Sequence, residues 1–342
     1  MKKLFLSLIA VAVGTLSSFA QSDLVATLSH GSSISTFIGV DALSEAYTAA
    51  VEGDVITLSS GTFNAVTMEK SLTIRGTGMH GLSNGIEPTM IVGDLSLKIP
   101  DDNHETPVFE GICFKNYVHI NSTNVAPINI FKCKFLKKFT CFGINANFVH
   151  CIIENGISCT NGNVTTRMNF VNSVIESPSS EGELSTMNIN NCVIINTLEH
   201  ICNSSLRNCI LVTRTGFGDH YLPNSSTANN CVAIEVNEGR KTTFSEVSGS
   251  NNSYAVNMES LFKTFGNYYY QGHCWIAGIT NLETFELTET AAATYLGDDG
   301  TQVGIYGGTN PFNPTPTNPQ VTNFTVNSTT VGDQLKVKIN VE

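Results

Sequence analysis

A short pattern that recurs eight times between about residues 109 and 255 constrains the fold more than any other feature of the sequence. Each copy leads to an anchor residue that apolar residues follow, as in Phe148-Val-His-Cys-Ile-Ile and Leu206-Arg-Asn-Cys-Ile-Leu. The anchors, spaced 17 to 22 residues apart, are Ile112, Cys133, Cys151, Ser173, Cys192, Cys209, Cys231 and Ser253. Internal repetition near twenty residues, with β-branched residues separated by Asn and Gly, predicts a solenoid of β-coils.

A coil of about twenty residues has room for three short strands and three turns, and coils stack at the strand spacing of about 4.8 Å. Further candidate coils lie near Ile74 and Val92 before the eight copies, and near Ile276 and Val303 after them. We therefore predict an all-β fold, a single-stranded parallel β-helix of about ten to twelve coils. Such a solenoid can absorb all 342 residues as one unit.

The ten cysteines suggest packing rather than disulfide pairing. Five of them occupy the anchor position, where Ser173 and Ser253 replace them in two other coils. A residue type that alternates with Ser at an inward position is a small packing element. We therefore expect mostly free, buried thiols, although an even count in an exported protein would first suggest disulfides. The sequence has no Cys-x-x-Cys spacing, which argues against a zinc site of the usual kind.

Asparagine directly precedes the anchor in five of the eight copies. These residues are Asn172, Asn191, Asn208, Asn230 and Asn252. Asn tolerates the left-handed conformation that a tight bend needs, and stacked Asn side chains can hydrogen-bond to one another and to the turn backbone. We predict a structural Asn ladder, with a polar ligand surface as the alternative.

If the anchor points inward, the next residue points outward, because side chains alternate along a strand. The outward column is Lys134, Ile152, Val174, Val193, Ile210, Val232 and Tyr254; two residues further on lie Leu136, Ile195, Val212 and Ile234, interrupted by Glu154 and Glu176. An apolar outer stripe of this length should not face water. We expect it to be covered, either by the C-terminal tail or by self-association with a second copy. A slip of one residue would instead exchange the two faces.

The N-terminal residues 1–20 have the features of a secretory signal peptide: two lysines, an apolar run and a small-residue cleavage site. The apolar run is too short for a membrane span, so we expect an exported protein, periplasmic, cell-surface or extracellular.

Residues 21–40 suggest a loose lead-in to the solenoid. Asp41 to Val51 then follows a helical apolar rhythm, with Asp41 as N-cap and Gly53 as the C-terminal breaker. We expect this helix to cover the open end of the solenoid.

Passages at both ends of the repeat resemble a known superfamily. Gly53-Asp-Val-Ile-Thr-Leu-Ser-Ser-Gly-Thr-Phe and Lys70-Ser-Leu-Thr-Ile-Arg-Gly resemble the opening strands of right-handed parallel β-helix proteins of the pectin-lyase-like superfamily. Residues 285–312, with Gly297-Asp-Asp-Gly and Val303-Gly-Ile-Tyr-Gly-Gly, are similar to the last coil of secreted β-helix proteins from Bacteroidetes-type bacteria. The resemblance covers about residues 41–312 and implies a right-handed β-helix. It specifies the fold and says little about activity.

The predicted organisation is a signal peptide over residues 1–20, the β-helix with its cap over 21–312 and a tail over 313–342. The tail begins with a proline-rich linker and continues with two strand-like segments, residues 321–326 and 335–341. These segments could form a hairpin, a sheet edge laid against the β-helix or a sorting segment for export.

Charge and aromatic residues bear on the ligand. The formal net charge is −11, and loss of the two signal lysines makes it −13. Nucleic acid needs a basic footprint, so we predict no nucleic-acid partner. The acidity also counts against anionic lipid and, unless a cation intervenes, against a polyuronate.

Four aromatic residues gather where the repeat ends: Tyr268, Tyr269, Tyr270 and Trp275. We take them as candidate polysaccharide-binding residues, with packing against the last coils as the alternative.

No residue constellation in the sequence identifies a catalytic site. A polysaccharide lyase needs a base beside a cation held by carboxylates, and a glycoside hydrolase needs two or three converging carboxylates. Glu154 and Glu176 occupy equivalent places in adjacent coils, but the coils above carry Ile195 and Val212. We expect no metal and no cofactor, with a bound calcium ion left open. The polar loop 101–105 is more simply a solvated excursion than a cation site.

The function that these observations favour is that of an exported, non-catalytic β-helix that binds or scaffolds, with polysaccharide as the ligand. This step is an analogy from the fold, and fold does not fix function. One alternative is a polysaccharide lyase or glycoside hydrolase acting on a complex glycan. The other is a purely structural surface protein.

Overall fold

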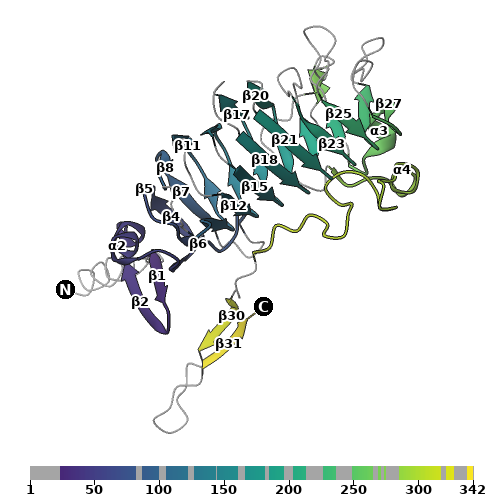
Figure 1. Cartoon of the computed structure of the whole chain (residues 1–342). Coiled ribbons are helices and arrows are strands. Elements are labelled where there is room, and N and C mark those ends of the chain that lie inside the picture. The colour runs from purple at the N-terminus through teal and green to yellow at the C-terminus, as the bar shows by residue number, and fades with distance from the viewer. Residues whose placement is uncertain are drawn as a thin grey trace, which may run out of the picture.

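The computed structural model describes most of the chain from residue 24 onward. The described residues are 24–81, 87–99, 105–121, 127–143, 145–160, 166–181, 185–195, 203–212, 226–235, 249–264, 269–270, 273–274, 285–316, 321–326 and 337–341. The predicted signal peptide and the candidate coil at Ile276 lie outside them. Within them the chain is an all-β parallel solenoid, as the repeat predicts (Figure 1).

Three sheets form the walls of the solenoid. The first has the order β2 (Ser33–Ile38), β1 (Val25–His30), β3 (Val55–Leu58), β6 (Thr73–Arg75), β9 (Val108–Glu110), β12 (Ile128–Phe131), β15 (Asn145–Val149), β18 (Thr166–Val171), β21 (Ser185–Asn190), β23 (Ser205–Arg207) and β25 (Thr227–Asn229). The second has the order β27 (Ser253–Asn257), β26 (Val232–Glu235), β24 (Ile210–Val212), β22 (Val193–Ile195), β19 (Val174–Glu176), β16 (Ile152–Ile153), β13 (Lys134–Phe135), β10 (Cys113–Phe114), β7 (Thr89–Val92) and β4 (Gly61–Asn64). The third has the order β20 (Pro178–Glu181), β17 (Ile157–Thr160), β14 (Phe139–Phe142), β11 (Val118–Asn121), β8 (Leu95–Leu97) and β5 (Thr67–Met68).

The number of complete turns is smaller than predicted. The third sheet has 6 strands, so six turns place a strand on all three sides, against the ten to twelve coils expected. In the part of the chain that the structure describes, the turns after β20 contribute only to the first two sheets. Each anchor marks only the corner between the first and second sheets, so it does not show whether that turn also has a strand in the third sheet. Counting anchors therefore overestimated the number of complete turns.

The N-terminal end departs from the expected loose lead-in. Strands β1 and β2 form an antiparallel hairpin, and β1 also pairs with β3, so the hairpin extends the first sheet. The predicted helix is present as α2 (Ala42–Ala49), with Ala42, Leu43 and Ala46 buried over the end of the core. Asp41 occupies the N-cap position but its side chain makes no capping hydrogen bond, and Val51 is 50% exposed. The capping role is confirmed, whereas the N-cap contact and the burial of Val51 are not.

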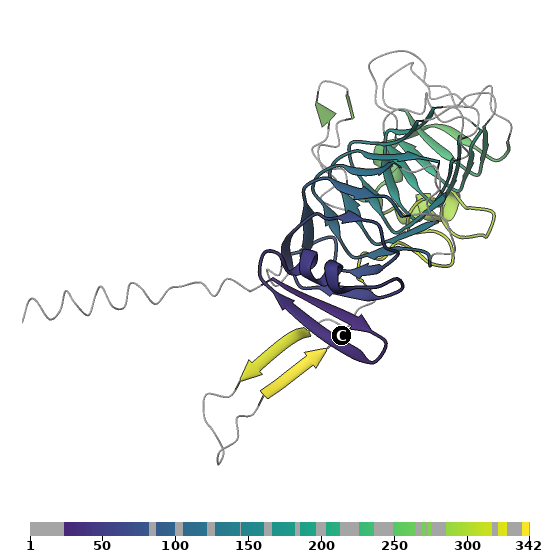
Figure 2. The ribbon, with the colours of Figure 1, turned by 60° about the vertical axis from the view of Figure 1, so that its left-hand side comes forward.

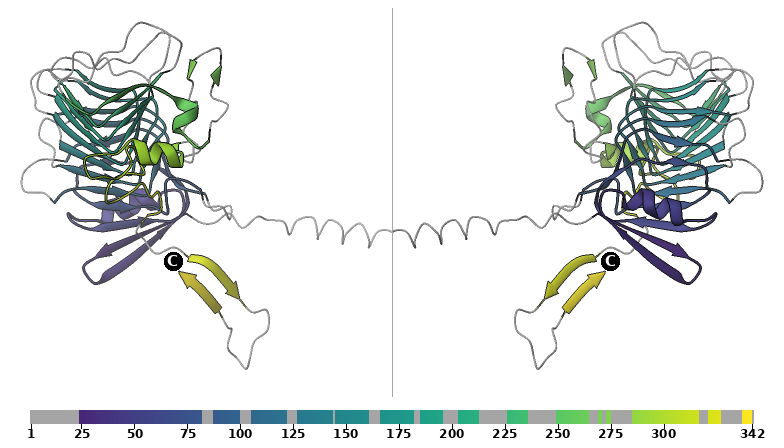
Figure 3. Two further views of the ribbon diagram at one scale, coloured as in Figure 1. Left: turned by 90° about the vertical axis from the view of Figure 1, so that its right-hand side faces the viewer. Right: turned by 90° about the vertical axis from the view of Figure 1, so that its left-hand side faces the viewer.

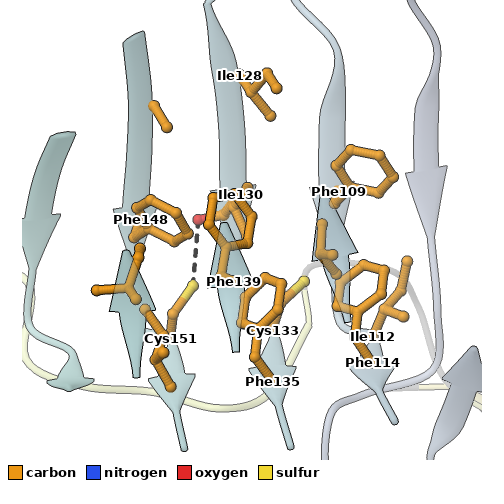
Figure 4. Packing of buried hydrophobic residues seen from close by; sticks show 14 of the residues in the cluster. Phe109, Ile112, Phe114, Ile128, Ile130, Cys133, Phe135, Phe139, Phe148 and Cys151 are labelled. Atoms are coloured by element: carbon orange, nitrogen blue, oxygen red, sulfur yellow. Dashed lines mark hydrogen bonds between the residues drawn. The ribbon is translucent and has the colours of Figure 1, made fainter. Parts of the chain in front are cut away.

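The inner core confirms the predicted inward position for seven of the eight anchors. Ser253 is the exception, because it pairs with the outward residue Val232 and lines a cavity outside the core. Cys133, Cys151 and the other anchor cysteines are fully buried, as is Ser173 (Figure 4). Rings also stack between successive turns: Phe148 and Phe170 lie 4.8 Å apart between their centroids. This core is continuous from α2 to the turn that contains Cys231.

A second hydrophobic cluster lies outside the solenoid, against the second sheet. It contains Ile152, Val174, Val193, Ile195, Ile210, Val212, Val232 and Ile234, which are the predicted outer stripe. The stripe is covered, as expected. The cover is not the predicted tail but residues 285–316, named here the strap, together with α3 (Met258–Leu261). The strap begins with α4 (Glu289–Thr294) and runs back along the outside of the solenoid (Figures 1 and 3).

This arrangement corrects the prediction that residues 285–312 form the last coil. Val303 is not on a coil, since it is buried in the outer cluster among the side chains of the stripe. Tyr254 differs from the rest of the outward column because it is 45% exposed, whereas Lys134 is buried like the apolar members although it is charged.

The predicted tail strands form a hairpin. Strands β30 (Val321–Val326) and β31 (Val337–Val341) pair antiparallel, which is the first of the three possibilities considered. Figures 2 and 3 place the hairpin near the β1–β2 end of the solenoid. A further short antiparallel pair joins β28 (Tyr269–Tyr270) and β29 (His273–Cys274).

Candidate functional site

The corner between the first and second sheets carries a column of left-handed residues, each directly before an anchor. The members of this left-handed column are Gly111, Lys132, His150, Asn172, Asn191, Asn208 and Asn230, all with φ between 44° and 67°. The predicted left-handed role of Asn is thus confirmed for four residues. It is wrong for Asn252: Asn251, one position earlier, has φ 59° instead. Asn252 hydrogen-bonds to the backbone of Cys231 and Ala228.

The anchor side chain completes each corner. Ser173 Oγ donates to the carbonyl oxygen two residues earlier at 2.9 Å, and Cys192 Sγ and Cys209 Sγ do the same at 3.1 Å. Cys and Ser therefore alternate at the anchor because both are small donors. Seven cysteines are free and buried among the described side chains: Cys113, Cys133, Cys141, Cys151, Cys192, Cys209 and Cys231. Burial raises the pKa of Cys151 to about 12, so this thiol is unreactive.

The side chains of the left-handed column hold the strap. Lys132 Nζ donates to the carbonyl oxygen of Thr315 at 2.6 Å, and His150 Nε2 donates to that of Asn310 at 3.0 Å. One turn further on, the amide of Asn172 donates to two strap carbonyl oxygens, those of Ile305 and Gly307, each at 2.8 Å.

At Asn208 the column uses both its side chain and its backbone. The amide nitrogen donates to Asp298 Oδ1 at 2.9 Å, while the Asn208 carbonyl oxygen accepts from the N–H of Gly304 at 2.8 Å. Asp298 also pairs with Arg207. Gly304 has φ 82°, and a Cβ there would lie 2.6 Å from the Ile210 side chain, so only glycine lets the strap approach this closely.

The predicted Asn ladder is therefore mainly a strap-binding device. Within the column only Asn208 and Asn191 join side chain to side chain, at 3.4 Å. A true ladder lies on the first sheet, where each side-chain amide nitrogen donates to the amide oxygen of the member one turn earlier, at 2.8 to 2.9 Å; its members are Asn129, Asn147, Asn169 and Asn188. Sequence reasoning missed this ladder, although its steps of 18, 22 and 19 follow the anchor spacing.

Beyond Asn208 the strap leaves the column and a cavity opens, named here the column cavity. Its volume is about 790 Å³, within the range of small-molecule sites. It is lined by Arg207, Asn229, Asn230, Cys231, Val232, Ser250, Asn251, Ser253, Thr294, Tyr295, Leu296, Gly297, Asp298 and Val303. Most of these are amides, hydroxyls or charged groups, and Tyr295 adds an aromatic ring.

The predicted ligand-binding aromatics are not part of what the structure shows at this cavity. Tyr268 and Trp275 lie outside the described residues, and of Tyr269 and Tyr270 only the backbone, in β28, is described. The lining residues that sequence reasoning missed include Asn251 and Tyr295, whereas Asn230 was predicted as a ladder residue with a polar ligand surface as the alternative. The column pattern was visible in the sequence, but nothing in the repeat shows where the strap stops covering it.

A polar cluster on the outer face of β10, β13 and β16 is closed to large ligands. Lys134 Nζ and Glu154 Oε1 lie 2.9 Å apart and both side chains are buried. Burial, reinforced by the Lys134 charge, lowers the pKa of nearby His80 to about 4. Glu176 does not join Glu154 in an acidic pair, because Glu176 Oε2 accepts the N–H of Asn155. Glu154 therefore pairs with Lys134 and Glu176 accepts a backbone N–H, although the two glutamates share a repeat position.

Neither a metal-binding cluster nor a membrane-spanning helix is present among the described residues. No group of three or more His, Cys, Asp or Glu that could hold a metal ion occurs there, and residues 101–104 of the polar loop lie outside them. Among the described helices, none has the length and apolar character to cross a bilayer.

The fold places the chain in the class of parallel β-solenoid proteins. No protein-family model, curated protein or solved structure matches the chain. Its function must therefore be argued from the strap, the column and the cavity.

Proposed function

We propose that the chain is an exported, non-catalytic β-solenoid that binds polysaccharide in the column cavity. The observation that carries this proposal is the lining of that cavity, which brings together Asn229, Asn230 and Asn251 with Tyr295 and the Arg207–Asp298 pair. Sugars present hydroxyl groups that planar amide and charged side chains bind, and apolar faces that aromatic rings bind.

The position of the cavity suits a polymer better than a small metabolite. It lies on the outside of the solenoid, beside strap residues 294–303, and the side chains of Arg207 and Asp298 are 51% and 40% exposed. A chain of sugars could therefore enter and leave without the solenoid opening. Membership of the pectin-lyase-like superfamily and likeness to exported β-helix proteins of Bacteroidetes-type bacteria are part of this proposal, supported by the opening strands β3, β4 and β6.

Self-association through the outer stripe is not part of the proposal. The stripe is buried under the strap, so a second copy could contact it only after displacing about thirty residues of the same chain.

The test is a screen of the chain lacking residues 1–20 against plant, algal and host polysaccharides. Retention should be followed on immobilised glycans, together with absorbance at 235 nm, which reports the unsaturated product of a lyase. Retention that falls in an Arg207→Ala, Tyr295→Ala double variant, with no new absorbance, is the expected result. Rising absorbance would identify a lyase instead. Unchanged retention of the double variant would show that the column cavity is not the binding site.

A further inference from the structure

We infer that the column cavity recognises acetamido groups, so that the ligand is a glycan containing N-acetylated amino sugars. This inference rests on the proposed function and narrows its substrate class. It comes from the strap, which shows how the left-handed column binds an amide.

The covered turns bind amides in two ways. The Asn172 side chain donates its N–H groups to two peptide carbonyl oxygens. The backbone carbonyl of Asn208 accepts a peptide N–H, that of Gly304. A column residue therefore offers a donor for a C=O and an acceptor for an N–H, which are the two groups of an acetamide.

Two positions of this corner are left without the strap. Asn230 and Asn251 line the column cavity, where Asn230 is partly exposed and Asn251 is exposed. They lie on successive turns, so their backbones are about one strand spacing, 4.8 Å, apart. An acetamido group that reached them would find the same donors and acceptors that the strap uses one turn away.

The rest of the lining favours a neutral amide over a carboxylate. Arg207, the cation of the cavity lining, is already paired with Asp298, and the chain as a whole is acidic. A uronate would meet the Asp298 charge without a free cation to balance it. Leu296, which is 46% exposed, and the ring of Tyr295 supply apolar surface for an acetamido methyl group.

The lining also favours a sugar over a peptide. The strap is a peptide, and it is held as much by Val303, Ile305 and Phe312, which are buried in the outer cluster, as by hydrogen bonds. The column cavity is lined mostly by polar residues. Its lining residues Val232 and Val303 are already buried, so few apolar contacts of the kind that anchors the strap remain for a ligand. A second peptide strand would lack the anchors that hold the strap.

The test compares oligomers of N-acetylglucosamine with glucosamine and glucose oligomers of the same length, using calorimetry. Asn230→Gly and Asn251→Gly each keep a residue that tolerates positive φ and remove one amide. Asn188→Ala, at the far end of the first-sheet ladder, is the matched control. Unfolding curves of all variants check that the fold is kept.

We expect the acetylated oligomer to bind at least tenfold more tightly than the other two. Either glycine variant should lose that preference, and the control should keep it. Equal binding of all three oligomers would overturn the inference and leave polysaccharide binding intact. Binding of acetylated peptides but of no glycan would overturn both the inference and the proposed function, as would failure to bind any glycan in the panel.

Discussion

The inner core and the outer cluster bury similar side chains but are built in different ways. In the inner core each residue packs on its equivalent one turn away, about twenty residues along the chain, as Phe148 packs on Phe170. The outer cluster joins residues of the repeat to residues 285–316, and its hydrogen bonds span 133 residues at Asn172 and 183 at Lys132. The inner core follows from the repeat alone, whereas the outer cluster needs a segment that the repeat does not contain.

The two regions should therefore fail differently when they are damaged. A defect in the inner core breaks the stacking of neighbouring turns and should destabilise the whole solenoid. A defect in the outer cluster should first free the strap, because the turns beneath it keep their own hydrogen bonds.

The largest effect is expected from Phe148→Ala. The ring is fully buried between Phe139 and Phe170, and removing it should lower the free energy of unfolding by about 3–5 kcal/mol. Chemical denaturation followed by circular dichroism measures the loss. Hydrogen exchange should rise in turns on both sides of the mutation, and a rise confined to the strap would contradict the comparison.

Ile305→Ala tests the outer cluster. Ile305 is 1% exposed in the strap, and its truncation should cost about 2–4 kcal/mol of the free energy that holds the strap down. Limited proteolysis should then cut within residues 285–316 while far-ultraviolet circular dichroism stays unchanged. The control is Val51→Ala at an exposed position just after α2, and equal proteolysis of the two variants would count against a separate strap.

Acid should weaken the packing of His80 near the buried Lys134–Glu154 pair and the contact of His150 with the strap. Burial lowers the pKa of His80 to about 4 and also lowers that of His150. Because the folded-state pKa lies below the unfolded value of about 6.5, this stabilisation is complete above pH 6.5 and is lost as the pH falls toward 4. The full pKa difference of His80 would correspond to about 3 kcal/mol, and its partial exposure lowers the expected loss to roughly 2 kcal/mol. A His80→Gln variant should show a shallower slope in that window, and an identical slope would show that other groups titrate there.

Asn172→Gly should remove about 1–2 kcal/mol, since two hydrogen bonds to the strap disappear while the left-handed backbone is kept. Hydrogen exchange of the amides of residues 303–308 measures the local loosening. Asn172→Ala separates the two contributions, because alanine adds backbone strain at φ 44°. If glycine and alanine were equally harmful, the side-chain contacts would carry the whole effect.

The smallest effect is expected from Cys209→Ser, about 1 kcal/mol or less, because serine already fills this position at Ser173 with the same contact. Cys209→Val, which has no donor, should cost more. The difference between their denaturation midpoints measures the hydrogen bond, and equal midpoints would mean that the anchor acts only through its volume.

The sequence predicted the parts of the molecule that repeat. Anchor spacing indicated the solenoid, alternation gave the inward and outward faces, and Asn before the anchor indicated the left-handed corner. The strap was mistaken for a coil because Val303-Gly-Ile-Tyr-Gly-Gly has the apolar and glycine content of a strand and its turn. Its real partner, the outer stripe, lies between 69 residues (Ile234) and 151 residues (Ile152) before Val303, and alternation within a strand says nothing about contacts at that distance.

The candidate site was predicted only in part. Asn230 was recognised as a corner residue, but its exposure depends on where the strap turns away, at Gly297 and Asp298. The shift from Asn252 to Asn251 arose because consecutive Asn residues fit the pattern equally well, and only backbone geometry distinguishes them.

The strap also sets an order of events in time. A ribosome delivers Ile152 to Ile234 before residues 285–316, so the growing chain must carry a bare apolar stripe until the strap is made. The solenoid can wind turn by turn as it emerges, but its outside is finished only when residues 285–316 have been added. A chain cut short before residue 285 would therefore be recognisable to chaperones and proteases as an unfinished product.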